Sequence, residues 1–248
     1  VTPESLRAVI TSNTHLVSVM YANNEIGTIE PIKELCEIAH TNGALFHTDA
    51  VQTVGHVQID VKALGIDMLS ASAHKFNGPK GIGFLYIKKG TPINSYASGG
   101  AQEFGMRAGT ENIASIVGMA VALKKNYDNL EVNTSHVLKL ERTLLDTLAN
   151  ANVDCIRNGQ NMLPGIISLS FPEFEGETIM HRLDFMRIQV STGSACDSVN
   201  TQISHVLKAL ELSDDVAKGT IRISIGKYNT EEDIEAIAEA LIKIVNKE

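Results

Sequence analysis

Short apolar runs that each end in a polar turn recur through the first half of this chain. Their length and their polar ends are typical of buried strands. We predict strands at Leu16 to Tyr21, Ala44 to Thr48, Asp67 to Ala71 and Ile82 to Ile87. Pro31 opens a helix in which apolar residues recur at helical spacing, and a weaker helical stretch lies around Val61 to Leu64. The strand–helix alternation predicts parallel neighbours, and the short turn before the last strand predicts an antiparallel one.

The pattern changes after Asn129. We predict helices at 113–126, 130–150 and 177–185, an amphipathic helix over Ile203 to Leu210, and strands at Val153 to Ile156, Ile166 to Phe171 and Ile221 to Ile225. Thr230 caps the last helix, with Asp233 three residues later. We therefore predict an α/β fold with part of a large domain at 1–129, built on a mostly parallel sheet with helices on both faces. A smaller α+β domain would follow at 130–248.

Polar side chains gather where the first three predicted strands end. These residues are Asn24 after the first strand, Asp49 and Gln52 after the second, and Ser72, His74 and Lys75 after the third. Parallel strands bring such groups to one edge of the sheet, where open α/β sheets bind ligands. Any one of them can be a turn residue bonding to its own loop. The whole set favours a binding site, because a lysine, a carboxylate and amide groups converge.

Lys75 allows two interpretations from its own surroundings. A lysine held against apolar groups loses its charge more readily and becomes a nucleophilic amine. The alternative is a surface lysine in a hairpin, and the stretch alone favours neither. Arg222 alternates with apolar neighbours in its strand, so it points to one face. It can anchor a carboxylate bidentately or pair with a structural acid.

The three cysteines differ in their surroundings. Cys36 falls on the apolar face of its helix and Cys155 alternates within a predicted strand, so we interpret both as structural. Cys196 lies in a run of small polar residues before an amphipathic helix, where the helix N-terminus favours the thiolate and Asp197 opposes it. A mobile, exposed and reactive cysteine is one interpretation of this loop. An incidental exposed cysteine is the other.

Composition narrows the function classes. The chain has 248 residues, of which 44% are hydrophobic and 20% charged, as in an ordinary globular protein, and no apolar run is long enough to span a bilayer. The net charge of -8 disfavours direct nucleic-acid binding. An odd number of widely spaced cysteines favours a reducing, cytoplasmic compartment. The chain opens on Val1-Thr2-Pro3-Glu4, and we interpret it as a piece of a longer protein.

Six segments together resemble the cysteine desulfurases, which are fold-type I pyridoxal-phosphate enzymes of the class V aminotransferase group. The segments are YANNEIGT (21–28), HTDAVQ (47–52), SASAHKFNGPKGIGFLY (70–86), RAGTENI (107–113), STGSAC (191–196) and TIRISIG (220–226). Each is weak alone, but all six follow the family's order and spacing. Roughly the first third of the family's pattern has no counterpart here, including the histidine that stacks on the cofactor ring.

The resemblance implies a role for each candidate residue. Lys75 would hold pyridoxal 5'-phosphate as a Schiff base and move the substrate's α-proton, while Asp49 would keep the pyridine nitrogen protonated. The remaining cofactor contacts would come from Asn24, Gln52, Ser72, His74 and, toward the partner subunit's cofactor in a homodimer, Thr110. Arg222, with Asn24, would bind the substrate carboxylate. Cys196 would take the sulfur. No metal is implied.

The implied reaction converts L-cysteine into L-alanine and a persulfide on Cys196. The sulfur would pass to an iron–sulfur scaffold protein or a tRNA-thiolation enzyme, and no membrane contact is expected. Two other interpretations stay open on the sequence. One is a catalytically silent fragment or sulfur-transfer scaffold. The other is a related enzyme on the same scaffold, such as a selenocysteine lyase or an aminotransferase.

Overall fold

The chain folds as two compact units. The structure is a computed structural model and describes residues 1–193 and 203–246. The first unit comprises Val1–Tyr21 and Glu30–Leu130, and the second comprises Ala22–Ile29 and Glu131–Glu248. The predicted domains were 1–129 and 130–248. Segment 22–29 falls within the first predicted domain, but it lies in the second unit of the structure.

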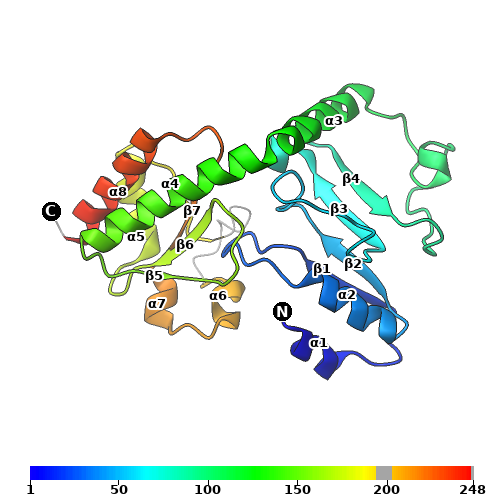
Figure 1. Cartoon of the computed structure of the whole chain (residues 1–248), viewed down its shortest axis with the longest axis horizontal. Helices are drawn as coiled ribbons and strands as arrows, with labels where there is room; N and C mark the ends of the chain where they lie inside the picture. Colours follow the sequence, from blue (N-terminus) through cyan, green and yellow to red (C-terminus); the bar gives the residue numbers. More distant parts are fainter. Residues whose placement is uncertain (194–202, 247–248) are drawn as a thin grey trace. The chain divides into compact units, whose positions relative to one another are not determined.

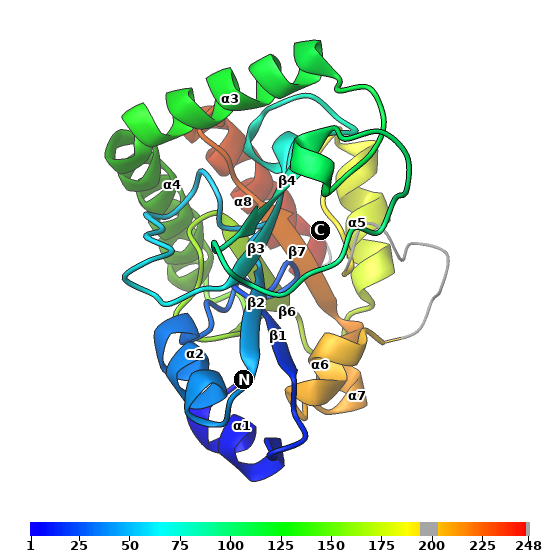
Figure 2. The ribbon, with the colours of Figure 1, turned by 90° about the vertical axis from the view of Figure 1, so that its right-hand side faces the viewer.

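The first unit is built on a four-stranded sheet, whose strands can be followed in Figures 1 and 2. Its elements are α1 (Pro3–Val9), β1 (Leu16–Met20), α2 (Ile32–Thr41), β2 (Leu45–Asp49), β3 (Met68–Ser72), the 3₁₀ helix η1 (Ala73–Phe76), β4 (Gly83–Ile87), the 3₁₀ helix η2 (Glu103–Gly105) and α3 (Ile113–Asp128). The strand order is β1-β2-β3-β4. The first three strands are parallel and β4 is antiparallel to β3, which confirms the predicted directions.

Alternation along the strands separates the two faces of this sheet. Phe46 and Thr48 of β2 are fully buried, on the face where α2 packs, whereas His47 and Asp49 point to the opposite face. That opposite face is open in places, since Leu16 and Leu85 are 50% and 48% exposed. The expectation that the first strand is buried was therefore wrong for most of β1: only Val17 of Leu16–Met20 is buried.

The start of β3 is tied to its neighbours by one buried carboxylate. Asp67 Oδ2 accepts from His40 Nε2 at 2.6 Å and from the Phe46 amide at 2.9 Å, and Oδ1 accepts from Lys88 Nζ at 3.2 Å. Burial raises the pKa of this carboxyl, but the hydrogen bonds from these three donors outweigh it and the pKa lies below its ordinary value. The residues before it, around Val61 to Leu64, form turns rather than the expected helix, because Asp60 accepts from the amides of Lys62 and Ala63.

The second unit contains a three-stranded antiparallel sheet in the order β5-β6-β7. Its elements are α4 (Leu130–Asn150), β5 (Ile156–Arg157), β6 (Ile166–Ser170), α5 (Gly176–Phe185), α6 (His205–Ala209), α7 (Asp214–Lys218), β7 (Thr220–Ser224) and α8 (Glu231–Val245). Two predictions were too long: β5 begins only at Ile156, and α6 covers five residues. The predicted cap of α8 is confirmed, because Thr230 and Asp233 form a reciprocal capping box.

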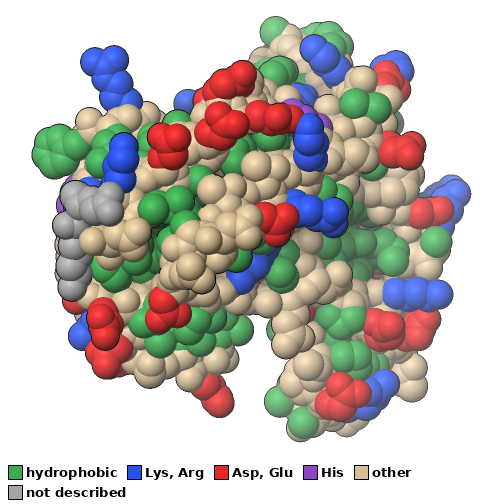
Figure 3. Space-filling view, turned by 60° about the vertical axis from the view of Figure 1, so that its left-hand side comes forward, with side chains coloured by type: hydrophobic (Ala, Val, Ile, Leu, Met, Phe, Trp, Pro, Cys, Tyr) green, Lys and Arg blue, Asp and Glu red, His purple; other side chains and the backbone are tan. Residues whose placement is uncertain are grey.

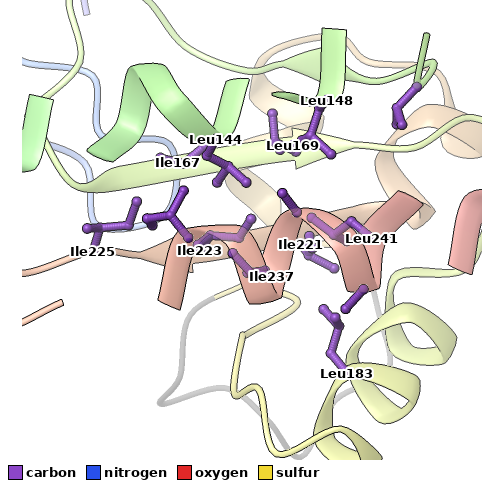
Figure 4. Packing of buried hydrophobic residues seen from close by; sticks show 14 of the residues in the cluster. Leu144, Leu148, Ile167, Leu169, Leu183, Ile221, Ile223, Ile225, Ile237 and Leu241 are labelled. Atoms are coloured by element: carbon purple, nitrogen blue, oxygen red, sulfur yellow. The ribbon is translucent and has the colours of Figure 1, made fainter. Parts of the chain in front are cut away.

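The main core of the second unit lies on one face of that sheet. Figure 4 shows Leu144 and Leu148 of α4, Ile167 and Leu169 of β6, and Ile221 and Ile223 of β7 among side chains from α8 and Leu183 of α5. Strand alternation leaves the other face polar, with Ser168, Ser170, Thr220 and Arg222. Asn158 donates to the hydroxyls of Ser168 and Ser170 there, so buried polar groups are satisfied by one another.

Segment 22–29 joins this second unit as an irregular hairpin. Ala22 bridges to Ile29, and Thr28 bridges to Met162. Ile26 is 5% exposed and forms a small apolar cluster with Leu207 of α6 and Ala217 of α7. Gly27 has a φ of +75°, and a Cβ there would lie 3.1 Å from the Ile166 carbonyl oxygen, so the turn needs glycine.

The surface carries charges of both signs, interspersed on the face seen in Figure 3. Among the described residues, no helix has the length and hydropathy needed to cross a membrane.

Candidate active site

The first unit brings four of the predicted residues to the carboxyl edge of its parallel strands. Asp49 is the last residue of β2 and pairs in register with Ser70 of β3. Ser72 ends β3, and His74 and Lys75 follow at once in η1. Parallel pairing of β2 and β3 is what places these groups at one edge, as the sequence predicted.

Asp49 presents its carboxylate from the open face of the sheet. The side chain is exposed, and Oδ1 accepts from the Val51 amide at 2.9 Å, which fixes the turn after β2. His47 lies on the same face, with Nδ1 2.8 Å from Ser18 Oγ. Burial lowers the pKa of His47, and the opposing effect of Asp49 is smaller, so the ring is neutral at pH 7. His47 therefore provides no positive charge for Asp49 at this pH.

Ser72, His74 and Lys75 form a short polar run with one internal contact. Ser72 Oγ lies 2.8 Å from His74 Nδ1. Both His74 and Lys75 are exposed, whereas Ala73 and Phe76 on either side are fully buried. Of the two interpretations left open for Lys75, the described structure has the exposed one, because its side chain is not held against apolar surroundings. The 3₁₀ turn buries its first and fourth residues and directs the two between them outward.

The backbone under Lys75 is held more firmly than its side chain. The Phe76 carbonyl accepts from buried Asn126 Nδ2 of α3 at 2.6 Å, and the Lys75 carbonyl accepts from His56 Nε2 at 2.9 Å. A Cβ at Gly55 would lie 2.8 Å from the Phe76 Cβ, so the loop packs closely on η1. These contacts fix the position of the Lys75 backbone, while the Lys75 side chain remains exposed.

Two predicted residues of the first unit lie in loops. Gln52 is half-buried in the turn after β2, three residues beyond Asp49. Thr110 is exposed in the loop before α3, next to Gly109, whose φ is +110° and whose amide donates to Gln102 Oε1 at 3.2 Å. The role of Thr110 toward a partner subunit stays a prediction.

The second unit brings the two predicted substrate-binding residues together. Arg222 Nη1 donates to the Asn24 carbonyl oxygen at 3.0 Å. Arg222 lies on β7, and its backbone both donates to and accepts from the backbone of Ser191. The Arg222 side chain lies on the polar face of the sheet. The contact joins residues that are far apart in sequence and gives the guanidinium a defined place beside the Asn23–Gly27 turn.

Cys36 and Cys155, the two cysteines among the described residues, are both free thiols. Cys36 is 1% exposed, and burial raises its pKa to about 11, which confirms its predicted core position. Cys155 precedes β5 instead of alternating within it; it is half-buried against the main core, and burial raises its pKa. Cys196, the predicted sulfur acceptor, falls in 194–202, outside the described residues.

Three residues that lie next to candidate residues were not identified from the sequence: His56, Asn126 and Glu25. His56 and Asn126 contact η1 from 19 and 50 residues away in sequence, and buried Glu25 lies next to Asn24. Asn126, a polar residue at the C-terminal end of an apolar helix, was a signal that could have been used. Within 1–193 and 203–246, no group of three or more His, Cys, Asp or Glu side chains is arranged to hold a metal ion.

Comparison with known proteins assigns the chain to a family. Residues 1–237 match the family model described as Aminotransferase class-V. "Cysteine desulfurase IscS" of Dictyoglomus turgidum is 45% identical over 249 residues, which cover 100% of this chain and 63% of that protein. "Cysteine desulfurase NifS" of Azotobacter vinelandii is 42% identical over 98% of this chain and 61% of its own length. The chain thus spans less than two thirds of the curated relatives it matches.

Solved structures with a similar fold include relatives of the same kind. A structure titled "NIFS-LIKE PROTEIN" superposes with a TM-score of 0.90 at 37% identity, covering 100% of this chain and 66% of its own. A second, titled "SspA in complex with cysteine", has a TM-score of 0.77 at 32% identity and covers 93% of this chain and 64% of its own.

The mixed α/β architecture and these neighbours define the class: the fold is that of the fold-type I pyridoxal-phosphate enzymes. More narrowly, the chain belongs to the class-V aminotransferase family, whose members depend on pyridoxal phosphate.

Proposed function

We propose that the protein containing this chain is a pyridoxal-phosphate-dependent cysteine desulfurase. The observation that carries the proposal is the edge of β2 and β3, where Asp49, Ser72, His74 and Lys75 follow two adjacent parallel strands. The names of the relatives at 42–46% identity support the reaction, and the structure titled with bound cysteine supports the substrate.

The chemistry of this donor set fits the cofactor. An exposed primary amine can attach an aldehyde, a carboxylate can pair with a ring nitrogen, and a hydroxyl with an imidazole can bind phosphate. The amine, the carboxylate and the imidazole belong to exposed residues, while the backbone beneath Lys75 is anchored by His56 and Asn126. When bound, pyridoxal phosphate supplies an electron sink that weakens bonds at the substrate's α-carbon.

Each residue then has a defined task. Lys75 would hold the cofactor through its amine, and the same amine would move the α-proton of the substrate. Asp49 would hold the proton at the pyridine nitrogen, Ser72 and His74 would bind the phosphate, and Gln52 and Asn24 would contact the cofactor ring. Arg222 binds the carboxylate of L-cysteine through its guanidinium.

The proposed reaction balances without an outside oxidant. The substrate's carbon–sulfur bond breaks, the Cys196 thiolate forms a sulfur–sulfur bond with the departing sulfur, and the β-carbon gains a proton. The products are L-alanine and a persulfide on Cys196. We further propose that an iron–sulfur scaffold or tRNA-thiolation protein accepts the sulfur, and that the enzyme is a homodimer in which Thr110 reaches the partner's cofactor. We also propose a cytoplasmic location, because three widely spaced cysteines, an odd number, favour a reducing compartment.

Borohydride trapping tests the cofactor assignment. We expect reduction of the pyridoxal-phosphate-loaded protein to leave the label on the peptide that contains Lys75, because Lys75 follows β3 at the strand edge where Asp49 ends β2. Lys75→Ala should abolish the label, and Lys80→Ala, five residues away, is the matched control that should keep it. A label on Lys80 or Lys88 would contradict the proposal.

Mass spectrometry after addition of L-cysteine tests the sulfur chemistry. We expect one added sulfur on Cys196, none after Cys196→Ala, and retained cofactor labelling in that variant. Undiminished desulfuration by Cys196→Ala would favour a related enzyme that needs no cysteine nucleophile. Cofactor labelling without desulfuration by the wild type would favour a silent scaffold.

A further inference from the structure

Glu25 is a buried carboxylate to which the proposed reaction assigns no task. It is 5% exposed and lies in the turn that begins at Asn23. Asn23 Oδ1 accepts from the amides of Glu25 at 2.8 Å and Ile26 at 3.0 Å, and the Asn23 carbonyl accepts from Gly27 at 3.0 Å. These bonds fix the turn, so the direction in which Glu25 leaves the backbone is set locally.

The Glu25 carboxylate holds the residue that follows segment 194–202. Ser204 Oγ donates to Glu25 Oε2 at 2.6 Å and accepts from the Val206 amide at 3.0 Å, capping α6. The hydroxyl therefore links Glu25 to the first turn of that helix. Burial makes this charge-assisted bond stronger than it would be in water.

Apolar packing supports the same connection. Ile26, next to Glu25, is buried against Leu207 of α6 and Ala217 of α7, and Ile203 packs against this cluster. The hairpin 22–29 is thus held to residues 203–217 by both a hydrogen bond and a small core. The cluster is separate from the main core of the second unit, which contains none of these residues.

The residues that precede segment 194–202 also adjoin Glu25. Ser191 pairs with Arg222 through backbone hydrogen bonds in both directions, and Arg222 Nη1 donates to the Asn24 carbonyl. A Cβ built on Gly193 would lie 3.7 Å from Glu25 Oε2. Both described flanks of the segment that contains Cys196 therefore meet at the Asn24–Glu25 turn.

We propose that Glu25 is a positioning residue that holds Ser204 and the first turn of α6 against the Asn24–Glu25 turn, which Arg222 contacts, and so places the described residues after segment 194–202 beside the proposed substrate-binding arginine. This inference rests on the proposed function. Glu25 touches neither substrate nor cofactor in this role. Its carboxylate acts through Ser204, while the backbone carbonyl of the neighbouring Asn24 accepts from Arg222. Reaction rates depend steeply on such alignment, so loosening one flank slows sulfur transfer without weakening carboxylate binding.

Hydrogen exchange and single-turnover kinetics on the cofactor-loaded protein test the proposal. Glu25→Ala and Ser204→Ala should speed exchange of the Val206 and Leu207 amides roughly tenfold, with β6 and β7 unchanged. Both should slow sulfur transfer to Cys196 about tenfold while the KM for L-cysteine stays within about twofold. Glu25→Gln should restore most of the rate, because its amide oxygen still accepts from Ser204.

Glu141→Ala is the matched control in the same unit. Glu141 is also a buried carboxylate; it accepts from the Gly165 amide and pairs with Arg157, away from α6. Its loss should lower stability without changing exchange at Val206. Unchanged exchange at Val206 in Glu25→Ala, or a Glu25→Gln variant as slow as Glu25→Ala, would overturn the proposal. Hydrogen exchange does not depend on turnover. It therefore tests the Glu25–Ser204 contact even if the wild type proves unable to desulfurate cysteine.

Discussion

Asp67 should be among the polar residues whose loss costs the first unit most stability. Its side chain is 5% exposed and accepts three hydrogen bonds, from His40 Nε2, the Phe46 amide and Lys88 Nζ. Asp67→Ala removes all three and leaves the amide of fully buried Phe46 without its partner. Asp67→Asn keeps the shape and can still accept from that amide, but it loses the charge.

The size of the effect follows from burial at each partner. A hydrogen bond to a charged group contributes about 1.5–3 kcal/mol, and an unsatisfied buried amide costs about 1–3 kcal/mol. Lys88 is 53% exposed, so solvent screening limits its share to at most ~1 kcal/mol. We expect Asp67→Ala to lower the free energy of unfolding by about 3–4 kcal/mol. Asp67→Asn should lower it by about 1–2 kcal/mol.

The pH dependence provides a sharper test than the magnitude. The pKa of Asp67 in the folded protein lies below its ordinary value of 3.8, so the carboxylate contributes stability in full above that value. The contribution is lost as pH falls through the folded pKa. The difference between wild type and Asp67→Asn should thus shrink as pH falls below about 4.

Urea unfolding followed by circular dichroism gives the free energies, since the chain has no tryptophan. Hydrogen exchange by mass spectrometry assigns the loss to a unit: amides of β1 to β4 should exchange faster, and those of β5 to β7 should not. Lys88→Met is the control, with an expected loss below ~1 kcal/mol. A difference between wild type and Asp67→Asn that persists unchanged at pH 3 would refute this reasoning.

Three further outcomes are expected. Asp49→Asn should leave the circular dichroism spectrum intact, because its carboxylate is exposed, but reduce desulfuration more than about tenfold, equivalent to ~1.4 kcal/mol of barrier; near-normal turnover would show that the proton it holds is unimportant. Asn126→Ala should cost about 1–3 kcal/mol by urea unfolding because the Phe76 carbonyl loses its buried donor, whereas exposed Asn129→Ala should cost under ~0.5 kcal/mol; equal losses would contradict this. Cys36 should resist iodoacetamide at pH 8, where a thiol with a pKa of about 11 is about 0.1% thiolate, and its labelling should rise with pH; rapid labelling of the folded protein would argue against its burial.

The sequence by itself determined the elements and the order of the candidate groups. The apolar runs end within one residue of the ends of β2 and β3, so the sequence alone assigns Asp49, Ser72, His74 and Lys75 to one sheet edge. The capping box at Thr230 and the long apolar stripe of α4 also follow from local patterns. These features depend on residues within a few positions of one another, which periodicity records directly.

Only the tertiary structure decided what those elements contact. Segment 22–29 follows a strand of the first unit but packs in the second, where Glu25 meets Ser204 across 179 residues. Lys75 fits a buried strand end by pattern, yet η1 turns its side chain to solvent and fixes its backbone through Asn126 and His56. Hydrophobic patterning reveals that a side chain is buried but not its partner, because that choice depends on long-range packing rather than on neighbouring residues.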